Sequence, residues 1–218
     1  MIPLRDVIPS RTTPYITVTI IVLNAVAWCY ELALPGHALP AFLQIYGVVP
    51  ADFEASTLVT SMFLHGSWLH VIGNMWYLWI FGDNVEDRVG HGGFIVLYLM
   101  CGFVAALGQT VVDPDSTLPM VGARGAIAGV MGAYFVLYPR SRVLMLIPLV
   151  IYWEIIEVPA TMLLGFWFLM QLFSAGAIAV TAGTGGGVAF MAHIAGFIAG
   201  IGGIFVFRRR RTPEHYWA

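Results

Sequence analysis

Apolar stretches long enough to cross a lipid bilayer recur along the chain. A membrane-spanning helix needs about 20 consecutive apolar residues, and six stretches approach that length. They cover residues 15–34, 68–81, 93–112, 122–138, 159–180 and 187–207, of which the second and fourth are short or rich in glycine. Charged residues make up 10% of the chain, whereas a soluble domain carries about 25%. The sequence therefore excludes a cytosolic enzyme and predicts an all-α, polytopic membrane bundle of six transmembrane helices, formed by residues 1–218 as a single domain.

The arginines indicate which ends of these helices face the cytoplasm. All ten basic residues of the chain are arginines, and nine of them lie before the first stretch or after the second, fourth and sixth. The loops predicted on the other side, 35–67, 113–121 and 181–186, hold no basic residue. The positive-inside rule places both termini in the cytoplasm. We also expect a multi-pass protein of a bacterial plasma membrane. Arg124 is the exception to this pattern.

Two connecting segments are also apolar. The connection at 35–67 is the longest, and its composition predicts that it is partly submerged in the membrane. The run at 143–153 is too short to cross a bilayer. We expect this second segment to lie along the membrane surface or to extend the fifth helix.

Three of the predicted helices carry polar side chains near their outer ends. His70 and Asn74 lie four residues apart and therefore on one face of the second helix. Arg124 lies at the start of the fourth helix and His193 near the start of the sixth, so all four side chains lie roughly 3–10 Å below the outer surface. Polar groups inside a membrane are costly and indicate function, so the common depth predicts one shared site. The alternatives are an interhelical clasp between His70 and Asn74, and a bond from His193 to a neighbouring backbone group.

Glycines at a spacing of four mark the fourth and sixth helices. Gly125 and Gly129 lie in the fourth, and Gly196 and Gly200 lie in the sixth. Small residues at this spacing let two membrane helices approach closely. We interpret them as packing surfaces that bring the start of the fourth helix against His193.

Several short motifs occur in order along these helices. They are HVIGN at 70–74, FGDNVEDR at 81–88, GARG at 122–125 and AHIAG at 192–196. EVPA at 157–160 and GFW at 165–167, followed by Gln171, complete the set. Each motif alone is weak, but their ordered combination covers nearly the whole chain. In these residues the chain resembles the rhomboid intramembrane serine proteases.

The resemblance implies a serine–histidine dyad without a third, acidic member. The family's serine is the third residue of a Gly-x-Ser-Gly motif at the head of the fourth helix and attacks a peptide bond, with His193 as general base and then general acid. His70 and Asn74 would stabilise the oxyanion, together with backbone N–H groups at the head of that helix. The resemblance further implies that substrates are single-span membrane proteins entering from the lipid, and that water reaches the site through a cavity open to the outside.

Position 124 departs from the family pattern at the residue that carries the chemistry. Arg124 stands where the family has its nucleophilic serine. A guanidinium has five donors and no acceptor and stays protonated, so His193 cannot activate it to attack a carbonyl. In other serine proteases, loss of the nucleophile lowers turnover on the order of 10⁶-fold. We therefore expect the chain to be proteolytically inactive or nearly so.

Three functions are compatible with these residues. The first is a rhomboid protease scaffold carrying an inactivating residue at position 124, and the second is a pseudoprotease that binds client transmembrane helices without cleaving them. The third, a small transporter or channel, is disfavoured because paired carboxylates inside the membrane are lacking. His65, His70 and His193 have no acidic or thiol companions at metal-ligand spacing. We expect no metal ion, no other cofactor and no nucleic-acid partner, only membrane lipid and transmembrane-helix proteins.

Overall fold

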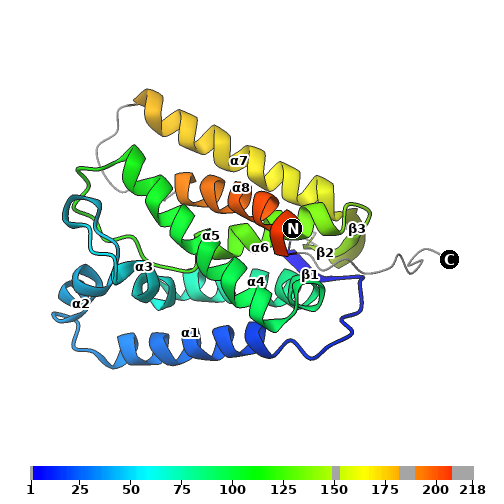
Figure 1. Ribbon diagram of the computed structural model, residues 1–218, viewed down its shortest axis with the longest axis horizontal. Helices are drawn as coiled ribbons and strands as arrows, with labels where there is room; N and C mark the ends of the chain where they lie inside the picture. Colours follow the sequence, from blue (N-terminus) through cyan, green and yellow to red (C-terminus); the bar gives the residue numbers. More distant parts are fainter. Residues whose placement is uncertain (1, 149–152, 182–189, 208–218) are drawn as a thin grey trace.

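Six long helices form a bundle in the computed structural model, which describes residues 2–148, 153–181 and 190–207 (Figure 1). They are α1 (Tyr15–Ala33), α4 (Trp68–Val89), α5 (His91–Val112), α6 (Arg124–Leu137), α7 (Ala160–Thr181) and α8 (Phe190–Phe207). Four of these, α1, α5, α7 and α8, contain stretches long and apolar enough to cross a membrane. The predicted helical membrane bundle is confirmed. The predicted start of the sixth helix, at 187–189, lies outside the described residues.

The other two long helices differ from the hydropathy pattern in opposite ways. The apolar stretch at 68–81 is only part of α4, which continues for 22 residues to Val89. Its second half carries charged side chains that a hydropathy scan does not count as part of a span. The helix ends at Gly90, whose φ of 79° reverses the chain, and α5 begins at the next residue, His91. In contrast, α6 has only 14 residues and is shorter than the apolar stretch predicted at 122–138.

The long connection between α1 and α4 is built from short helical pieces. These are α2 (Leu39–Tyr46), the 3₁₀ turns Pro50–Asp52 and Ser61–Phe63, and α3 (Thr57–Thr60). Val48 forms a two-way backbone bridge with Met120, and the N–H of Gly122 donates to the carbonyl of Ser61 at 2.8 Å. The connection therefore holds the segment that leads into α6, which is where the predicted site lies.

The described residues of the segment at 143–153 do not extend the fifth helix, so that alternative was wrong, whereas a position along the membrane surface stays a prediction. Residues 143–148 belong to β2 (Arg142–Pro148), which pairs antiparallel with β3 (Trp153–Pro159). The N-terminal strand β1 (Ile2–Asp6) pairs with the other edge of β2, giving a three-stranded sheet in the order β1-β2-β3. Side chains on β2 alternate, with Val143 and Met145 buried, as expected for a sheet that covers one end of a bundle.

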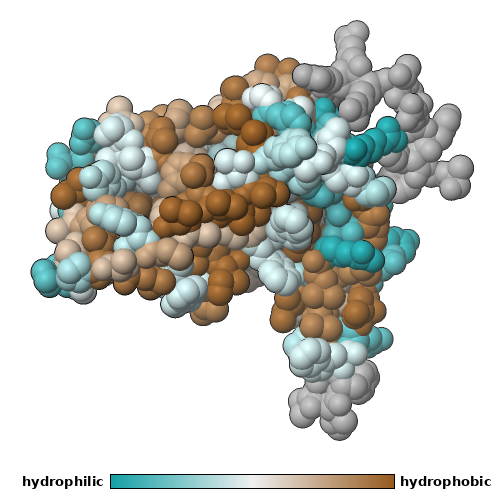
Figure 2. Space-filling model, turned by 90° about the horizontal axis from the view of Figure 1, so that it is seen from below, coloured by the Kyte–Doolittle hydropathy of each residue, from teal (hydrophilic) through white to brown (hydrophobic). Residues whose placement is uncertain are grey.

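This sheet adds a small β element to the otherwise helical fold. It lies at the end of the bundle where α6 ends and α7 begins (Figure 1). At that end, Figure 2 shows a lobe that projects sideways and carries apolar residues on its surface. The first strand therefore shares one end of the molecule with β2 and β3, which is consistent with the arginine pattern.

Asp6 anchors the first strand to the helices. Its carboxylate accepts hydrogen bonds from the Asn84 side chain at 2.8 Å and from the Tyr134 hydroxyl at 2.7 Å. Burial raises the pKa of Asp6 from 3.8 to about 7; the hydrogen bond from Tyr134 opposes this shift and the nearby Asp83 adds to it. The folded protein therefore binds a proton at Asp6 more tightly than the unfolded chain does.

We predict a pH-dependent stability that originates at Asp6. The raised pKa contributes stability at pH values below about 4, and that contribution is lost as the pH rises through about 7. The slope is at most about 1.4 kcal/mol per pH unit. Unfolding free energies measured between pH 4 and 8 should show this decline, and Asp6→Asn should flatten it. The exposed Asp52→Asn is the control, and an equal flattening in that variant would contradict the assignment to Asp6.

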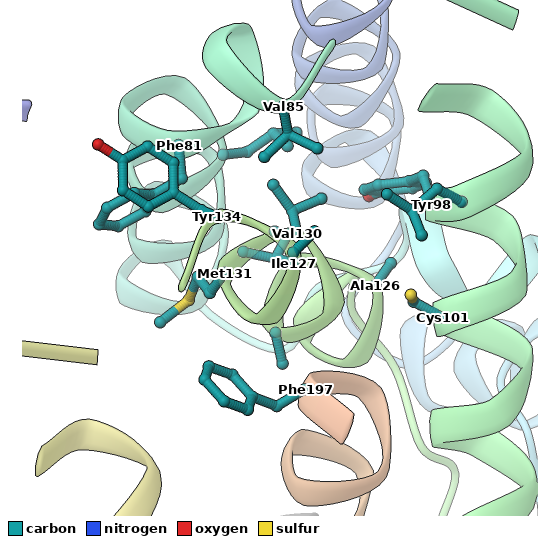
Figure 3. Close-up of a cluster of buried hydrophobic side chains, with 14 of the residues drawn as sticks. Phe81, Val85, Tyr98, Cys101, Ala126, Ile127, Val130, Met131, Tyr134 and Phe197 are labelled. Atoms are coloured by element: carbon teal, nitrogen blue, oxygen red, sulfur yellow. The ribbon is translucent and has the colours of Figure 1, made fainter. Parts of the chain in front are cut away.

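The core of the bundle is centred on α6. Every residue from Gly125 to Tyr134 is buried, which is the pattern of a helix surrounded on all sides. Figure 3 shows its side chains pointing toward three neighbouring helices. They meet Phe81 and Val85 of α4, Tyr98 and Cys101 of α5, and Phe197 of α8.

Glycines let α6 and α8 approach until their backbones touch. A Cβ on Gly200 would collide with the carbonyl of Gly129, and a Cβ on Gly196 would collide with the carbonyl of Gly125. The interpretation of these glycines as a packing surface is confirmed. Because His193 lies one turn before Gly196 and Arg124 directly precedes Gly125, the same contact brings His193 to the head of α6.

We predict that this contact tolerates no added methyl group. Gly200→Ala should lower the unfolding free energy by about 1–3 kcal/mol, the usual cost of overpacking. Gly202→Ala is a matched control on the same helix, because a Cβ at Gly202 meets nothing within 4 Å. Denaturant titration in detergent should leave the control unchanged or slightly stabilised. Equal losses in both variants would contradict the packing assignment.

Candidate functional site

The four side chains predicted to share a site line one cavity. His70 and Asn74 of α4, Arg124 of α6 and His193 of α8 border a pocket of about 210 Å³. This volume is ample for several water molecules. Its remaining walls are mainly apolar: Leu69, Gly73, Tyr77, Ile127, Ala128, Met131 and Trp167.

Gly122 places the head of α6 against the polar face of α4. Its φ of 106° lies in the left-handed region that favours glycine. A Cβ at this position would collide with the ring of His70 and lie 3.4 Å from Nδ2 of Asn74. A side chain is therefore excluded twice, by the backbone conformation and by the contact. The glycine brings the first turn of α6 next to His70 and Asn74.

His193 is held in place by two residues of α7. Its Nδ1 lies 2.8 Å from Oε1 of Gln171, and its ring packs edge-on against Trp167 at 5.5 Å between centroids. An amide oxygen only accepts hydrogen bonds, so Nδ1 carries the proton. The other ring nitrogen, Nε2, therefore has a free lone pair.

His70 has the opposite arrangement of donor and acceptor. The backbone N–H of Gly66 donates to Nδ1 of His70 at 3.4 Å, which leaves the proton on Nε2. Among the described residues, this buried Nε2 has no hydrogen-bond partner. The start of α4 is fixed by Ser67, whose side-chain oxygen caps the helix by accepting a hydrogen bond from the His70 backbone N–H.

The sequence did not predict a buried pair, His65 and Glu31, that lies next to the site residues Asn74 and His70. His65 is fully buried; its Nε2 accepts from Nδ2 of Asn74 at 3.0 Å, and its ring packs edge-on against His70. The backbone N–H of His65 donates to the carboxylate of Glu31 in α1, at 3.1 and 3.3 Å to the two oxygens. Glu31 is 2% exposed. A carboxylate in the first apolar stretch was a signal that could have been noticed, because such groups need a partner inside the membrane.

Arg124 borders both the His193 cavity and a second, smaller one. The second cavity, of about 40 Å³, is bordered by Ser61, Gly122 and Arg124, among others. Within the part of the chain that the structure describes, the Arg124 guanidinium has no hydrogen-bonded acceptor and no acidic partner. Its charge lies within electrostatic range of His65, His70 and His193.

The residues at the site offer donors and one basic nitrogen but no nucleophile. The described residues around the His193 cavity include no serine, threonine or cysteine. Ser61 borders the other cavity, Ser67 caps α4, and Ser141 bonds to Tyr134 near the sheet. No group of three metal-ligating side chains occurs among residues 2–148, 153–181 and 190–207.

Comparison with known proteins identifies the architecture. The model of the Rhomboid domain family matches residues 52–210, which is well over half of the chain. The chain belongs to the rhomboid family. It is 32% identical over 114 residues to Rhomboid-like protein 11, chloroplastic, of Arabidopsis thaliana, a match that covers 49% of the chain and 39% of the relative.

Two further relatives come from yeast and a bacterium. Rhomboid protein 1, mitochondrial, of Saccharomyces cerevisiae is 30% identical over 112 residues, covering 49% of the chain and 32% of the relative. Rhomboid protease GluP of Bacillus subtilis is 36% identical over 83 residues, covering 38% of the chain and 16% of the relative. The chain thus spans less than half the length of each of these rhomboid relatives. The family membership and the apolar helices together establish a multi-pass membrane protein.

Proposed function

We propose that this rhomboid domain is the scaffold of an intramembrane serine endopeptidase, inactive as it stands because Arg124 occupies the nucleophile position. The observation that most supports the proposal is the cavity shared by His70, Asn74, Arg124 and His193. Three of these side chains have the chemistry that acyl transfer needs. The fourth lies where the attacking group would be and cannot attack.

In an active form of this site, His193 is the general base. Its Nδ1–H donates to Gln171, which fixes the ring and leaves Nε2 free to take a proton from a serine at position 124. Gln171 fills the orienting role that an aspartate has in a three-membered triad. Trp167 shields one side of the ring and restricts its rotation.

His70 and Asn74 are the oxyanion donors. His70 borders the cavity, and its buried Nε2–H, next to Gly122 before the head of α6, has no partner among the described residues and can donate to a developing negative charge. Asn74 is oriented by its bond to His65, and its second N–H has no partner in the part of the chain that the structure describes. The first backbone N–H groups of α6 have no partner within the helix, and no side-chain cap bond is formed at its N-cap residue, so they add to the donor set.

The substrate class follows from the position of the site. A transmembrane helix of another protein would approach through the lipid, and its unwound end would enter the cavity where water is present. The cavity opens to the outer side of a bacterial plasma membrane, both termini lie in the cytoplasm, and residues 1–218 act as one domain with six crossings.

The decisive experiment is Arg124→Ser with a transmembrane substrate in liposomes. Cleavage that appears in this variant and disappears in Arg124→Ser/His193→Ala supports the protease scaffold. Absence of cleavage in a folded Arg124→Ser protein, with client helices still co-purifying, would instead support a non-catalytic rhomboid pseudoprotease. Solute flux through the liposomes would support a channel.

A further inference from the structure

The polar groups around the His193 cavity are dominated by unsatisfied donors. Arg124 has five N–H groups and, among the described residues, no acceptor. The buried Nε2–H of His70 also has no partner there. Both side chains border the same cavity. A site with an unpaired cation and a free donor is complementary to a group that only accepts hydrogen bonds and carries negative charge.

The position of Arg124 makes an unpaired state costly. A cation at a helix N-terminus is opposed by the helix dipole. Partial burial removes water from the guanidinium, and the described residues supply no counter-charge. An anion held between Arg124 and the head of α6 would relieve both costs, since the backbone N–H groups there also favour negative charge.

The walls of the cavity define the rest of the ligand. Leu69, Ile127, Met131 and Trp167 are apolar, and Gly73 and Ala128 leave space between them. Ligand pockets are commonly apolar with a few convergent polar groups that orient one end of the ligand. The polar end here is Arg124 with His70, and the remainder accommodates hydrocarbon.

We propose that this cavity, with Arg124 in place, binds a carboxylate carried on an apolar chain. The guanidinium holds the carboxylate in a two-bond fork, the Nε2–H of His70 donates a further bond, and the apolar walls cover the chain. The inference concerns the chain as it stands and does not depend on whether Arg124→Ser restores cleavage. The ligand is either a free fatty acid of the bilayer or the C-terminal carboxylate of an apolar peptide segment.

Octanoate binding to the protein in nanodiscs tests the proposal, with bound ligand counted by native mass spectrometry. Arg124→Gln should weaken binding roughly 10- to 100-fold, the effect of losing charge-assisted hydrogen bonds. Arg124→Lys keeps the charge but loses the two-bond fork, so its affinity for octanoate should lie between those of the parent protein and Arg124→Gln. Arg140→Gln is the matched control, because Arg140 is exposed and follows the other end of α6.

Several results would overturn the proposal. They are equal binding by Arg124→Gln and the parent protein, equal weakening by Arg140→Gln, and equal binding of neutral octanol. Thermal unfolding without ligand checks that each variant is folded, and Arg124→Lys supplies a second comparison if Arg124→Gln does not fold.

A second pair of probes distinguishes the two sources of the carboxylate. A short apolar peptide with a free C-terminal carboxylate is compared with its C-terminal amide and with octanoate. Preference for octanoate supports a fatty acid as the ligand, and preference for the peptide acid over its amide supports a protein chain end. Binding of neither acid would overturn the proposal.

Discussion

Arg124→Ser is expected to cleave a transmembrane substrate with a turnover on the order of 10⁶ times that of the parent chain. The substitution supplies a hydroxyl at the head of α6, in the cavity that also contains His193. Gln171 already holds the imidazole through Nδ1, which leaves the lone pair on Nε2, and within residues 2–148, 153–181 and 190–207 the Nε2–H of His70 has no hydrogen-bond partner. The remaining groups are therefore positioned before the serine is introduced.

The measurement is cleavage of a single-span substrate reconstituted with the protein in liposomes. Arg124→Ala is the first control, because it removes the cation without adding a nucleophile, and it should remain inactive. Arg124→Ser/His193→Ala should also be inactive, and Arg124→Ser/Gln171→Ala should be slower, since the histidine ring loses its partner. Activity in Arg124→Ala would show that the cleavage comes from another group.

Glu86→Ala is expected to lower the unfolding free energy by about 3–5 kcal/mol, the effect of breaking a buried charged network. Glu86 is fully buried and accepts from the backbone N–H groups of Ile16 and Thr17 and from the Thr17 hydroxyl, at 2.7–2.9 Å. It also contacts Nδ1 of His91 at 2.6 Å. One carboxylate thus caps the start of α1 and joins it to α4 and α5, and its loss leaves several buried donors unpaired.

The exposed ion pair on the sheet is the control for Glu86. Arg142 and Glu157 lie 3.1 Å apart, but their side chains are 61% and 47% exposed. Glu157→Ala should therefore change the unfolding free energy by at most about 1 kcal/mol. Denaturant titration of both variants in the same detergent gives the comparison. Similar losses in the two would contradict the role of Glu86 as the buried link between three helices.

Hydropathy predicted the helices well because it reports the property that the membrane selects. The stretches at 15–34, 93–112 and 159–180 correspond closely to α1, α5 and α7. The second half of α4 was not predicted, because it carries Asp83, Glu86 and Asp87, which lower its hydropathy. In the fold, Glu86 and Asp87 are buried, and the Asp83 carboxylate accepts a hydrogen bond from the Asn84 N–H. The pairing of β1 with β2 was missed because these strands lie more than 130 residues apart in sequence, and local patterns carry no signal for such pairing. The pairing of β2 with β3 is local, and it was missed because this apolar run was interpreted only as a membrane segment.

For the candidate site, the sequence predicted only how deep each polar side chain lies in the membrane, counted in residues from the outer end of its helix. The common depth of His70, Asn74, Arg124 and His193 indicated one cavity, and the four residues border one cavity. The orienting contacts were not predictable, because Gln171 and Glu31 act from helices whose rotation is set by packing. Their polar character inside apolar stretches was visible, but their partners were not.

Labelling with a fluorophosphonate tests the central claim most directly. The probe reacts only where a serine oxygen attacks phosphorus and expels fluoride, which requires nucleophile, base and oxyanion donors in one place. Intact mass spectrometry should show one adduct on Arg124→Ser, on the peptide that contains position 124, and none on the parent chain or on Arg124→Ser/His193→Ala. Absence of the adduct in a folded Arg124→Ser protein, or equal labelling without His193, would contradict the account.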